Sequence, residues 1–177
     1  EGDKTERLYF RNYRRRATGV RIEIPNNSYT DPLNLLDFAN KKADELGISR
    51  YTGSVWVVFD ADNNKEEDLV KARKEAKRHK VNLIFSNPSF EIWYLLHYLT
   101  SLSTAHLTND DLIRTLKRYI PNYDKTVCYF RQLEPLRDNA FKHALGLNNF
   151  HTSQGRDLIS KESNPSTQAG NLVKYLS

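Results

Sequence analysis

The sequence lacks the features that mark most secreted, membrane and motif-defined nucleotide-binding proteins. Cys128 is the only cysteine among 177 residues, which excludes an internal disulfide and suits a reducing compartment. No apolar run is long enough to cross a bilayer, and the first residues do not form a signal peptide. P-loop, G-x-G-x-x-G, H-E-x-x-H, Cys-x-x-Cys and G-x-S-x-G motifs are absent. We therefore expect a cytoplasmic protein that does not bind a membrane.

The size and charge of the chain set broad limits. A length of 177 residues suits one domain, or one domain with an appendage, and allows a hydrophobic core without disulfides. The formal net charge of +5 permits an anionic partner such as nucleic acid but does not require one.

Strand and helix patterns alternate in the first hundred residues. Asp31 and Pro32 form a good helix start, and Gly47 a good helix end. The expected strands are 20–24, 54–59 and 81–85, and the expected helices are 32–46, 64–80 and 90–99. This alternation predicts an α/β fold with a largely parallel sheet flanked by helices, over residues 1–100.

The pattern changes after about Ser101. Helices are expected at 110–119, 125–145, 153–160 and 167–176, and no strand is convincing. We therefore expect residues 101–177 to form a helical C-terminal region that packs on the sheet or makes a small lobe.

Two aspartates, Asp60 and Asp62, follow the most hydrophobic short run of the chain, 54–59. The run predicts a strand buried on both faces, and parallel sheets bind ligands at the carboxyl ends of their strands. Close carboxylates repel unless a cation shares their charge, and Mg²⁺ prefers carboxylate oxygen. A polar turn with a helix cap is the simpler explanation. An EF-hand is excluded because Lys65 and Lys71 occupy its glycine and glutamate positions.

Other polar residues have plain structural interpretations. Ser86 and Asn87 end the next strand, and Glu91 lies where an acid favours the positive end of a helix. His97 is expected to be a core histidine rather than a metal ligand. Two groups of cations could hold a nucleic-acid backbone. One is the run Arg14, Arg15 and Arg16, which has aromatic residues nearby in the sequence. The other is the basic end of the 64–80 helix, with Lys74 and Lys77.

Four segments together resemble the RloB family in order and spacing. They are Glu1-Gly-Asp-Lys-Thr-Glu6, Val57-Val-Phe-Asp-Ala-Asp62, Ser86-Asn-Pro-Ser-Phe-Glu-Ile-Trp93 and Asn164-Pro-Ser-Thr167. RloB-like proteins are bacterial, accompany restriction and abortive-infection loci of phage defence, and have a fold that resembles the Toprim domain. Family members have a hydrophobic strand before the first segment, whereas this sequence opens on Glu1.

The resemblance implies a set of site residues. Glu1, Asp60 and Asp62 would hold Mg²⁺ or Mn²⁺ and, with Glu91, carry phosphodiester hydrolysis. The rim of the site would contain Lys4, Thr5, Ser86, Asn87 and Ser89. The expected function is a metal-dependent nuclease that acts on DNA or RNA in phage defence, with a co-encoded defence ATPase as candidate partner.

Two other classes of function stay open. One is a non-catalytic Toprim-like module that binds nucleic acid or a nucleotide while a partner acts as effector. The other is a glycosyltransferase, since Val57-Val-Phe-Asp-Ala-Asp62 resembles a strand followed by a metal-binding D-x-D. The chain is short for that fold, and a phosphatase that uses the first aspartate as nucleophile fits less well still.

Overall fold

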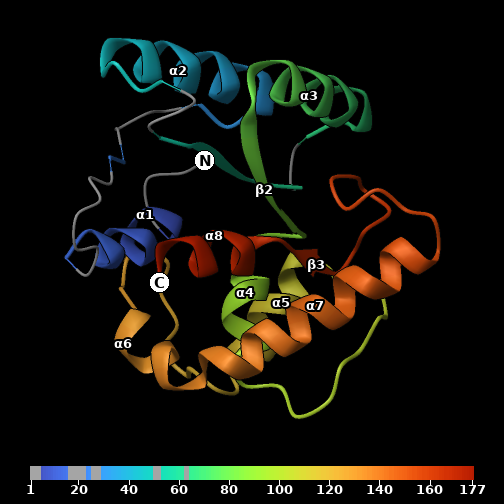
Figure 1. The fold of residues 1–177 in the computed structure, drawn as a ribbon. Coiled ribbons are helices and arrows are strands. Elements are labelled where there is room, and N and C mark those ends of the chain that lie inside the picture. Colours follow the sequence, from blue (N-terminus) through green and yellow to red (C-terminus); the bar gives the residue numbers. More distant parts are fainter. Residues whose placement is uncertain (1–4, 16–22, 25–28, 50–52, 62–63) are drawn as a thin grey trace.

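A small sheet lies between two layers of helices (Figure 1). The computed structural model describes residues 5–15, 23–24, 29–49, 53–61 and 64–177. Strand β1 (Val55–Asp60) is parallel to β2 (Val81–Asn87), and β2 is antiparallel to the short β3 (Ser166–Thr167). The strand order β1-β2-β3 places β2 at the centre.

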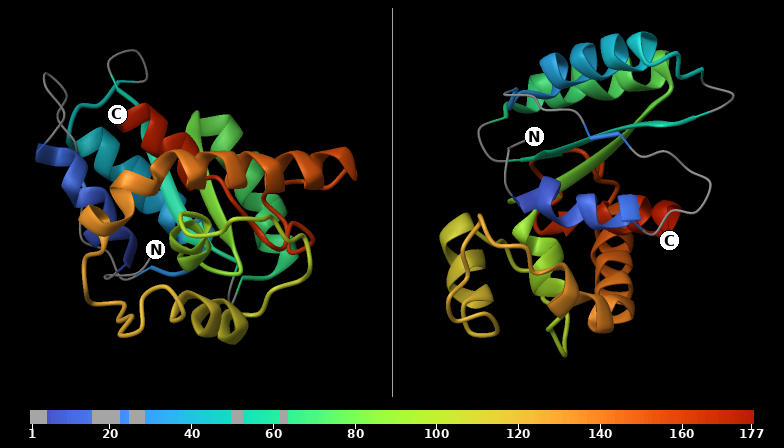
Figure 2. Two further views of the ribbon diagram at one scale, coloured as in Figure 1. Left: turned by 90° about the horizontal axis from the view of Figure 1, so that it is seen from below. Right: turned by 90° about the vertical axis from the view of Figure 1, so that its left-hand side faces the viewer.

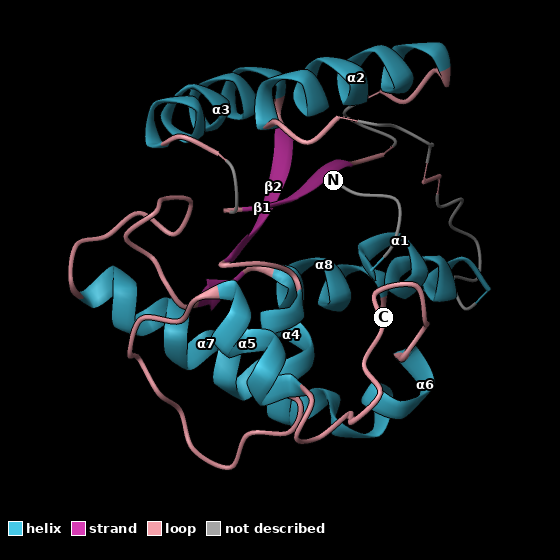
Figure 3. Ribbon diagram, turned by 180° about the vertical axis from the view of Figure 1, so that it is seen from behind, coloured by secondary structure: helices cyan, strands magenta, loops and turns pink. Residues whose placement is uncertain are grey.

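Helices α2 (Pro32–Glu45) and α3 (Glu66–His79) cover one face of the sheet. The opposite side holds α4 (Glu91–Leu96), α7 (Arg137–Ser153) and α8 (Ala169–Leu176), as two further views show (Figure 2). Behind them lies α5 (Asn109–Leu116), which packs on α4 (Figure 3). The shorter elements are α1 (Thr5–Phe10), η1 (Arg11–Arg15), α6 (Phe130–Leu133) and η2 (Glu134–Leu136).

Local sequence signals explain the ends of α2 and α3. The Asp31 carboxylate accepts the backbone N–H of Asn34 at 2.9 Å, and Pro32 opens α2 as expected. Gly47 follows α2 with φ +64°, a conformation that favours glycine. Helix α3 has three acids in its first turn and three basic residues in its last, which complements the helix dipole.

Two hydrophobic clusters lie on opposite faces of the sheet. Val57 and Phe59 of β1 pack with α2 and α3, whereas Trp56 and Val58 point to the other cluster and are only partly buried. Strand β1 is therefore fully buried on one face rather than on both. The second cluster contains side chains from before and after residue 100, including Phe90, Leu112 and Val173.

Several predicted elements need correction. The sheet of the described residues is mixed, because β3 adds an antiparallel strand where the sequence predicted a loop before the last helix. Glu23 and Ile24 are not in a strand, and the rest of the predicted strand 20–24 lies outside the described residues. The predicted helix 125–145 is instead a loop followed by α6, η2 and α7, and 153–160 is not helical beyond Ser153. Within the described ranges, every helix is too short or too polar to cross a bilayer.

Candidate functional site

The carboxyl ends of β1 and β2 meet at one edge of the sheet. Asp60 is the register partner of Ser86, and the next residue, Ala61, donates its N–H to the Ser86 carbonyl at 2.8 Å. The Asn64 amide donates to the Asp60 carbonyl at 2.7 Å and turns the chain toward α3. Asp60 thus lies at the strand-end position where parallel sheets bind ligands.

Ser86 and Asn87 bind the C-terminal part of the chain. The Ser86 hydroxyl lies 2.9 Å from the Thr167 hydroxyl. The Asn87 side chain accepts from the Asn164 amide at 2.9 Å and donates to the carbonyls of Ser160 and Lys161 at 3.1 and 3.2 Å. Both Asn-Pro bonds, 87–88 and 164–165, are cis. These two predicted rim residues therefore hold the 160–167 segment against the strand ends.

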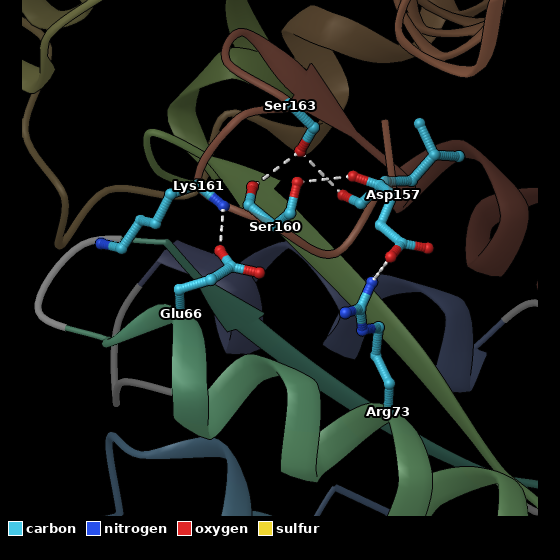
Figure 4. Close-up of polar contacts among 7 residues, drawn as sticks. Glu66, Arg73, Asp157, Ser160, Lys161 and Ser163 are labelled. Atoms are coloured by element: carbon cyan, nitrogen blue, oxygen red, sulfur yellow. Dashed lines mark hydrogen bonds and ion pairs between the residues drawn. The ribbon is translucent and has the colours of Figure 1, made fainter. Parts of the chain in front are cut away.

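The same segment is tied to α3 from the other side (Figure 4). Glu66 Oε2 accepts the backbone N–H of Lys161 at 2.8 Å, and Arg73 forms an ion pair with Asp157. Inside the loop, the Ser163 hydroxyl donates to two carbonyls, including that of Ser160 at 2.9 Å. The loop that connects α7 to β3 is therefore held on one side by the end of β2, through Asn87, and on the other by α3, through Glu66 and Arg73.

This loop brings a cation next to the end of β1. The Lys161 ammonium donates to the carbonyl of Ala61, the residue between Asp60 and Asp62. Lys161 lies in a polar stretch without helical or strand periodicity, so no local pattern indicated its role. Its place at this edge follows from contacts distant in the sequence, with Asn87, Glu66 and Ala61.

Of the two predicted site acids that the structure describes, Glu91 is more deeply buried than Asp60, at 2% exposure. Its Oε1 accepts the Tyr123 hydroxyl at 2.7 Å and the Thr5 hydroxyl at 3.3 Å, and lies 3.5 Å from the Lys125 ammonium. Thr5 and Glu91 were both predicted for the site, whereas Tyr123 and Lys125 were not. Glu91 thus joins the start of α1 to the loop after α5.

The electrostatics of this cluster keep Glu91 ionised. Burial raises the pKa of Glu91, but the Lys125 charge and hydrogen bonds from Tyr123 and Ser89 outweigh burial, and the net pKa is lowered. Burial and the neighbouring Glu91 charge raise the pKa of Tyr123, which therefore remains a hydrogen-bond donor. The arrangement is a buried, ionised carboxylate with a phenol donor.

The described residues supply only part of the predicted metal site. Asp60 and Glu91 are described, whereas Glu1, Lys4 and Asp62 lie outside the described residues. Within the described ranges, no three His, Cys, Asp or Glu side chains gather to hold a metal ion. The donor chemistry fits Mg²⁺ or Mn²⁺, because the predicted ligands are all carboxylates. Asp60, however, is the only one of the three proposed ligands that the structure places.

The predicted nucleic-acid contacts are on separate elements. Arg14 is half-exposed and pairs with Glu23 at 3.0 Å, which offsets its charge. Arg16 and the Arg15 side chain lie outside the described residues. Lys74 and Lys77 are exposed on α3, as expected for a solvated basic face.

Three buried histidines have structural roles. His97, His143 and His151 are buried, and each bonds a main-chain carbonyl through one ring nitrogen. Burial lowers the pKa of His97 to about 4, so this ring is neutral near pH 7. The prediction that His97 belongs to the core is confirmed.

Comparison with known proteins supports the resemblance noted in the sequence. A model of the family described as RloB-like protein matches residues 1–176. The chain belongs to the RloB-like family. Neither the curated proteins nor the solved structures contain a significant match. All four segments that carried the resemblance lie inside the range that matches the RloB-like family.

Proposed function

We propose that this chain is a metal-dependent nuclease that hydrolyses phosphodiester bonds of DNA or RNA in bacterial phage defence, in the cytoplasm. RloB-like family membership supports the biological setting. The observation that carries the chemistry is the position of Asp60, at the joined carboxyl ends of two parallel strands. Its fold would be Toprim-like, with a co-encoded defence ATPase as partner.

The proposed roles follow from the chemistry of the residues. Asp60, Asp62 and Glu1 would hold Mg²⁺ or Mn²⁺, which when bound supplies an activated water and stabilises charge on the phosphate. Lys161 would offer its ammonium to a substrate phosphate beside the acidic pair. Glu91 would hold the start of α1 in place through the Thr5 hydroxyl, so its role is positioning rather than direct contact with the phosphate.

Asp60→Asn tests the proposal. The amide keeps the shape of the side chain but removes the charge that a divalent ion needs. We expect cleavage to fall by at least roughly 100-fold, the upper end of the loss seen for groups that merely support a metal ligand. End-labelled single-stranded DNA, duplex DNA and transfer RNA are incubated with MgCl₂ or MnCl₂, and with EDTA as the metal-free reference.

Asp37→Asn on α2 is the matched control. Asp37 is exposed and pairs with Lys41. Helix α2 lies beside α3, on the side away from the loop that connects α7 to β3 (Figure 1). The Asp37→Asn protein should therefore cleave at the rate of the wild type. Equal cleavage by the Asp60→Asn and wild-type proteins would overturn the proposal.

One observation favours a non-catalytic binding module as the second candidate. The Lys161 ammonium already places positive charge on the Ala61 carbonyl, one residue after Asp60, so negative charge at this strand end can be balanced without an inorganic ion. A wild-type protein that binds nucleic acid in EDTA but cuts none of the substrates with either metal would support this function. Cleavage that depends on Mg²⁺ or Mn²⁺ and on Asp60 would exclude it.

A further inference from the structure

Two tyrosines form a stacked, partly exposed pair after the ends of α4 and α5. Tyr98 follows α4 and Tyr119 follows α5, and their rings are nearly parallel, with centroids 5.2 Å apart and 12° between the ring planes. Tyr119 is 41% exposed although one face lies on Tyr98, so much of the remaining ring faces solvent. A flat, open ring supported from below is a surface on which another planar group can stack.

The pair is held rigidly. The Gln132 amide donates to the Tyr98 hydroxyl at 2.9 Å. The N–H groups of Tyr119 and Ile120 both bond the Leu116 carbonyl at 2.9 Å, and Ile120 is buried in the core. A ligand that stacked on Tyr119 would therefore meet a pre-ordered ring and lose little affinity to ordering the protein.

Basic residues flank the stacked pair along the chain. The segment 112–133 contains five Lys or Arg residues and a single acid, Asp124. Lys117 and Arg118 directly precede Tyr119, and Arg131 precedes Gln132; all three are exposed. Among the ion pairs of the described ranges, none includes these three side chains. Their charge is thus available to an anionic partner.

We propose that Tyr98, Tyr119, Lys117, Arg118 and Arg131, the basic tyrosine patch, bind single-stranded nucleic acid, with an unpaired base stacked on Tyr119. Stacking needs an accessible base face, which a duplex hides. The cations could bind the phosphates of a single strand or of a duplex. Charge complementarity favours a polyanion over an apolar protein surface. The inference rests on the proposed function, because it specifies which form of nucleic acid that function would engage.

The patch lies close to the candidate site along the chain. Tyr123 and Lys125, which contact Glu91, are in the same segment as Tyr119, and Tyr98 follows the helix that begins with Glu91. A strand held on the patch would therefore bind at the end of α4 opposite Glu91, on the segment that also supplies Tyr123 and Lys125. This continuity is the reason to assign the patch to substrate binding.

Fluorescence anisotropy with the full chain in EDTA tests the inference without relying on cleavage. The probe is a labelled oligothymidylate of about 12 nucleotides, within the length that one binding fold covers, with oligouridylate of the same length to compare DNA and RNA. Tyr119→Ala should weaken binding roughly 5- to 150-fold, the loss expected when one stacked base is released. Tyr119→Phe should retain the affinity of the wild type.

Three controls separate stacking from charge. An abasic strand of equal length keeps the phosphates, so the wild type should bind it as weakly as Tyr119→Ala binds the oligothymidylate. Arg118→Gln should reduce the slope of log affinity against log salt by about 0.7. Tyr175→Ala removes another exposed ring, which lies on Trp56 at 5.1 Å and is 55% exposed, and should leave binding unchanged.

The outcomes distinguish this inference from the proposed function. Unchanged affinity in Tyr119→Ala, or equal affinity of the wild type for abasic and normal strands, would overturn the patch while leaving metal-dependent cleavage to be judged by Asp60→Asn. Stronger binding of a duplex than of the single strand would also overturn it. A strand carrying 5-iodouracil should cross-link to the Tyr119 peptide, a result that does not depend on how the variants fold.

Discussion

Replacing Tyr123 with phenylalanine tests whether the buried Glu91 carboxylate depends on its hydrogen-bond donors. The Tyr123 hydroxyl donates to Glu91 Oε1 over 2.7 Å, and both side chains are buried. Phenylalanine keeps the ring that packs edge-on against Tyr94 and removes only the hydroxyl. The variant therefore separates the hydrogen bond from the hydrophobic packing.

Ser89, Thr5 and Lys125 also contact Glu91, so the substitution removes one hydrogen bond of several rather than leaving the carboxylate without partners. A hydrogen bond to a charged group contributes about 1.5–3 kcal/mol. The Thr5 hydroxyl is at 3.3 Å, and the Lys125 side chain is 57% exposed, so water screens its charge. We expect Tyr123→Phe to lower the free energy of unfolding by about 2 kcal/mol at pH 7, which corresponds to a Tm lower by about 4–8 °C.

Urea unfolding, followed by tryptophan fluorescence, measures this change, because Trp93 is buried in the same core. In a Glu91→Gln background the acceptor is neutral, and the same substitution should cost only about 1 kcal/mol. Tyr98→Phe is the control, because its hydroxyl accepts at an exposed position, and should cost less than about 0.5 kcal/mol. A cost for Tyr123→Phe that is equally small, or equal in both backgrounds, would refute the reasoning.

The pH dependence gives an independent check on Glu91. Its pKa in the folded protein is lower than the ordinary value of 4.5, so the folded state favours the ionised form. The resulting stabilisation is complete above pH 4.5 and is lost as the pH falls through the folded-state pKa. The stability difference between the wild type and Glu91→Gln should therefore shrink below pH 4.5.

Two further predictions concern His97 and the loop on α3. Because burial lowers the pKa of His97 to about 4, the unfolded state takes up this proton first, and about 3 kcal/mol of stability should be lost between pH 6.5 and 4. Urea unfolding of His97→Gln across this range should show a flatter slope, and an unchanged slope would contradict the assignment. Glu66→Ala removes the acceptor of the Lys161 N–H. The lost hydrogen bond is worth about 1 kcal/mol, so amide hydrogen exchange at Lys161 should accelerate about fivefold. Glu67→Ala, one residue along α3, should leave that exchange rate unchanged, and equal rates in both variants would argue against the contact.

The elements that the sequence predicted well have strong local signals. Helix α2 has a capping Asp31 and a terminal Gly47, and β1 is a continuous apolar run. Strand β3 has only two residues and no alternating pattern, so its existence depends on its partners Ser86 and Asn87 rather than on its own sequence. The predicted helix at 153–160 fails for a related reason: Ser160 and its neighbours direct their polar groups to loop contacts.

The residues of the candidate site also fall into those that local sequence signals could place and those that they could not. Asp60, Ser86 and Asn87 could be placed from sequence, because the ends of two parallel strands must meet at one edge. Lys161 and Tyr123 could not, since they reach the site across about a hundred and about thirty residues from their partners Ala61 and Glu91. Contacts of such separation leave no periodic trace in a single sequence.

These long-range contacts decide which substitutions can report on chemistry. The short run from Ser86 to Glu91 binds the C-terminal loop through Asn87 and the loop after α5 through Glu91. A substitution at Asn87 would release Asn164 and two loop carbonyls as well as change the rim, so lost cleavage would have two causes. Asp60 lies at the end of β1, outside this run, and its substitution is the sharper test of catalysis. The Glu91 variants then measure how firmly the surrounding framework holds the site.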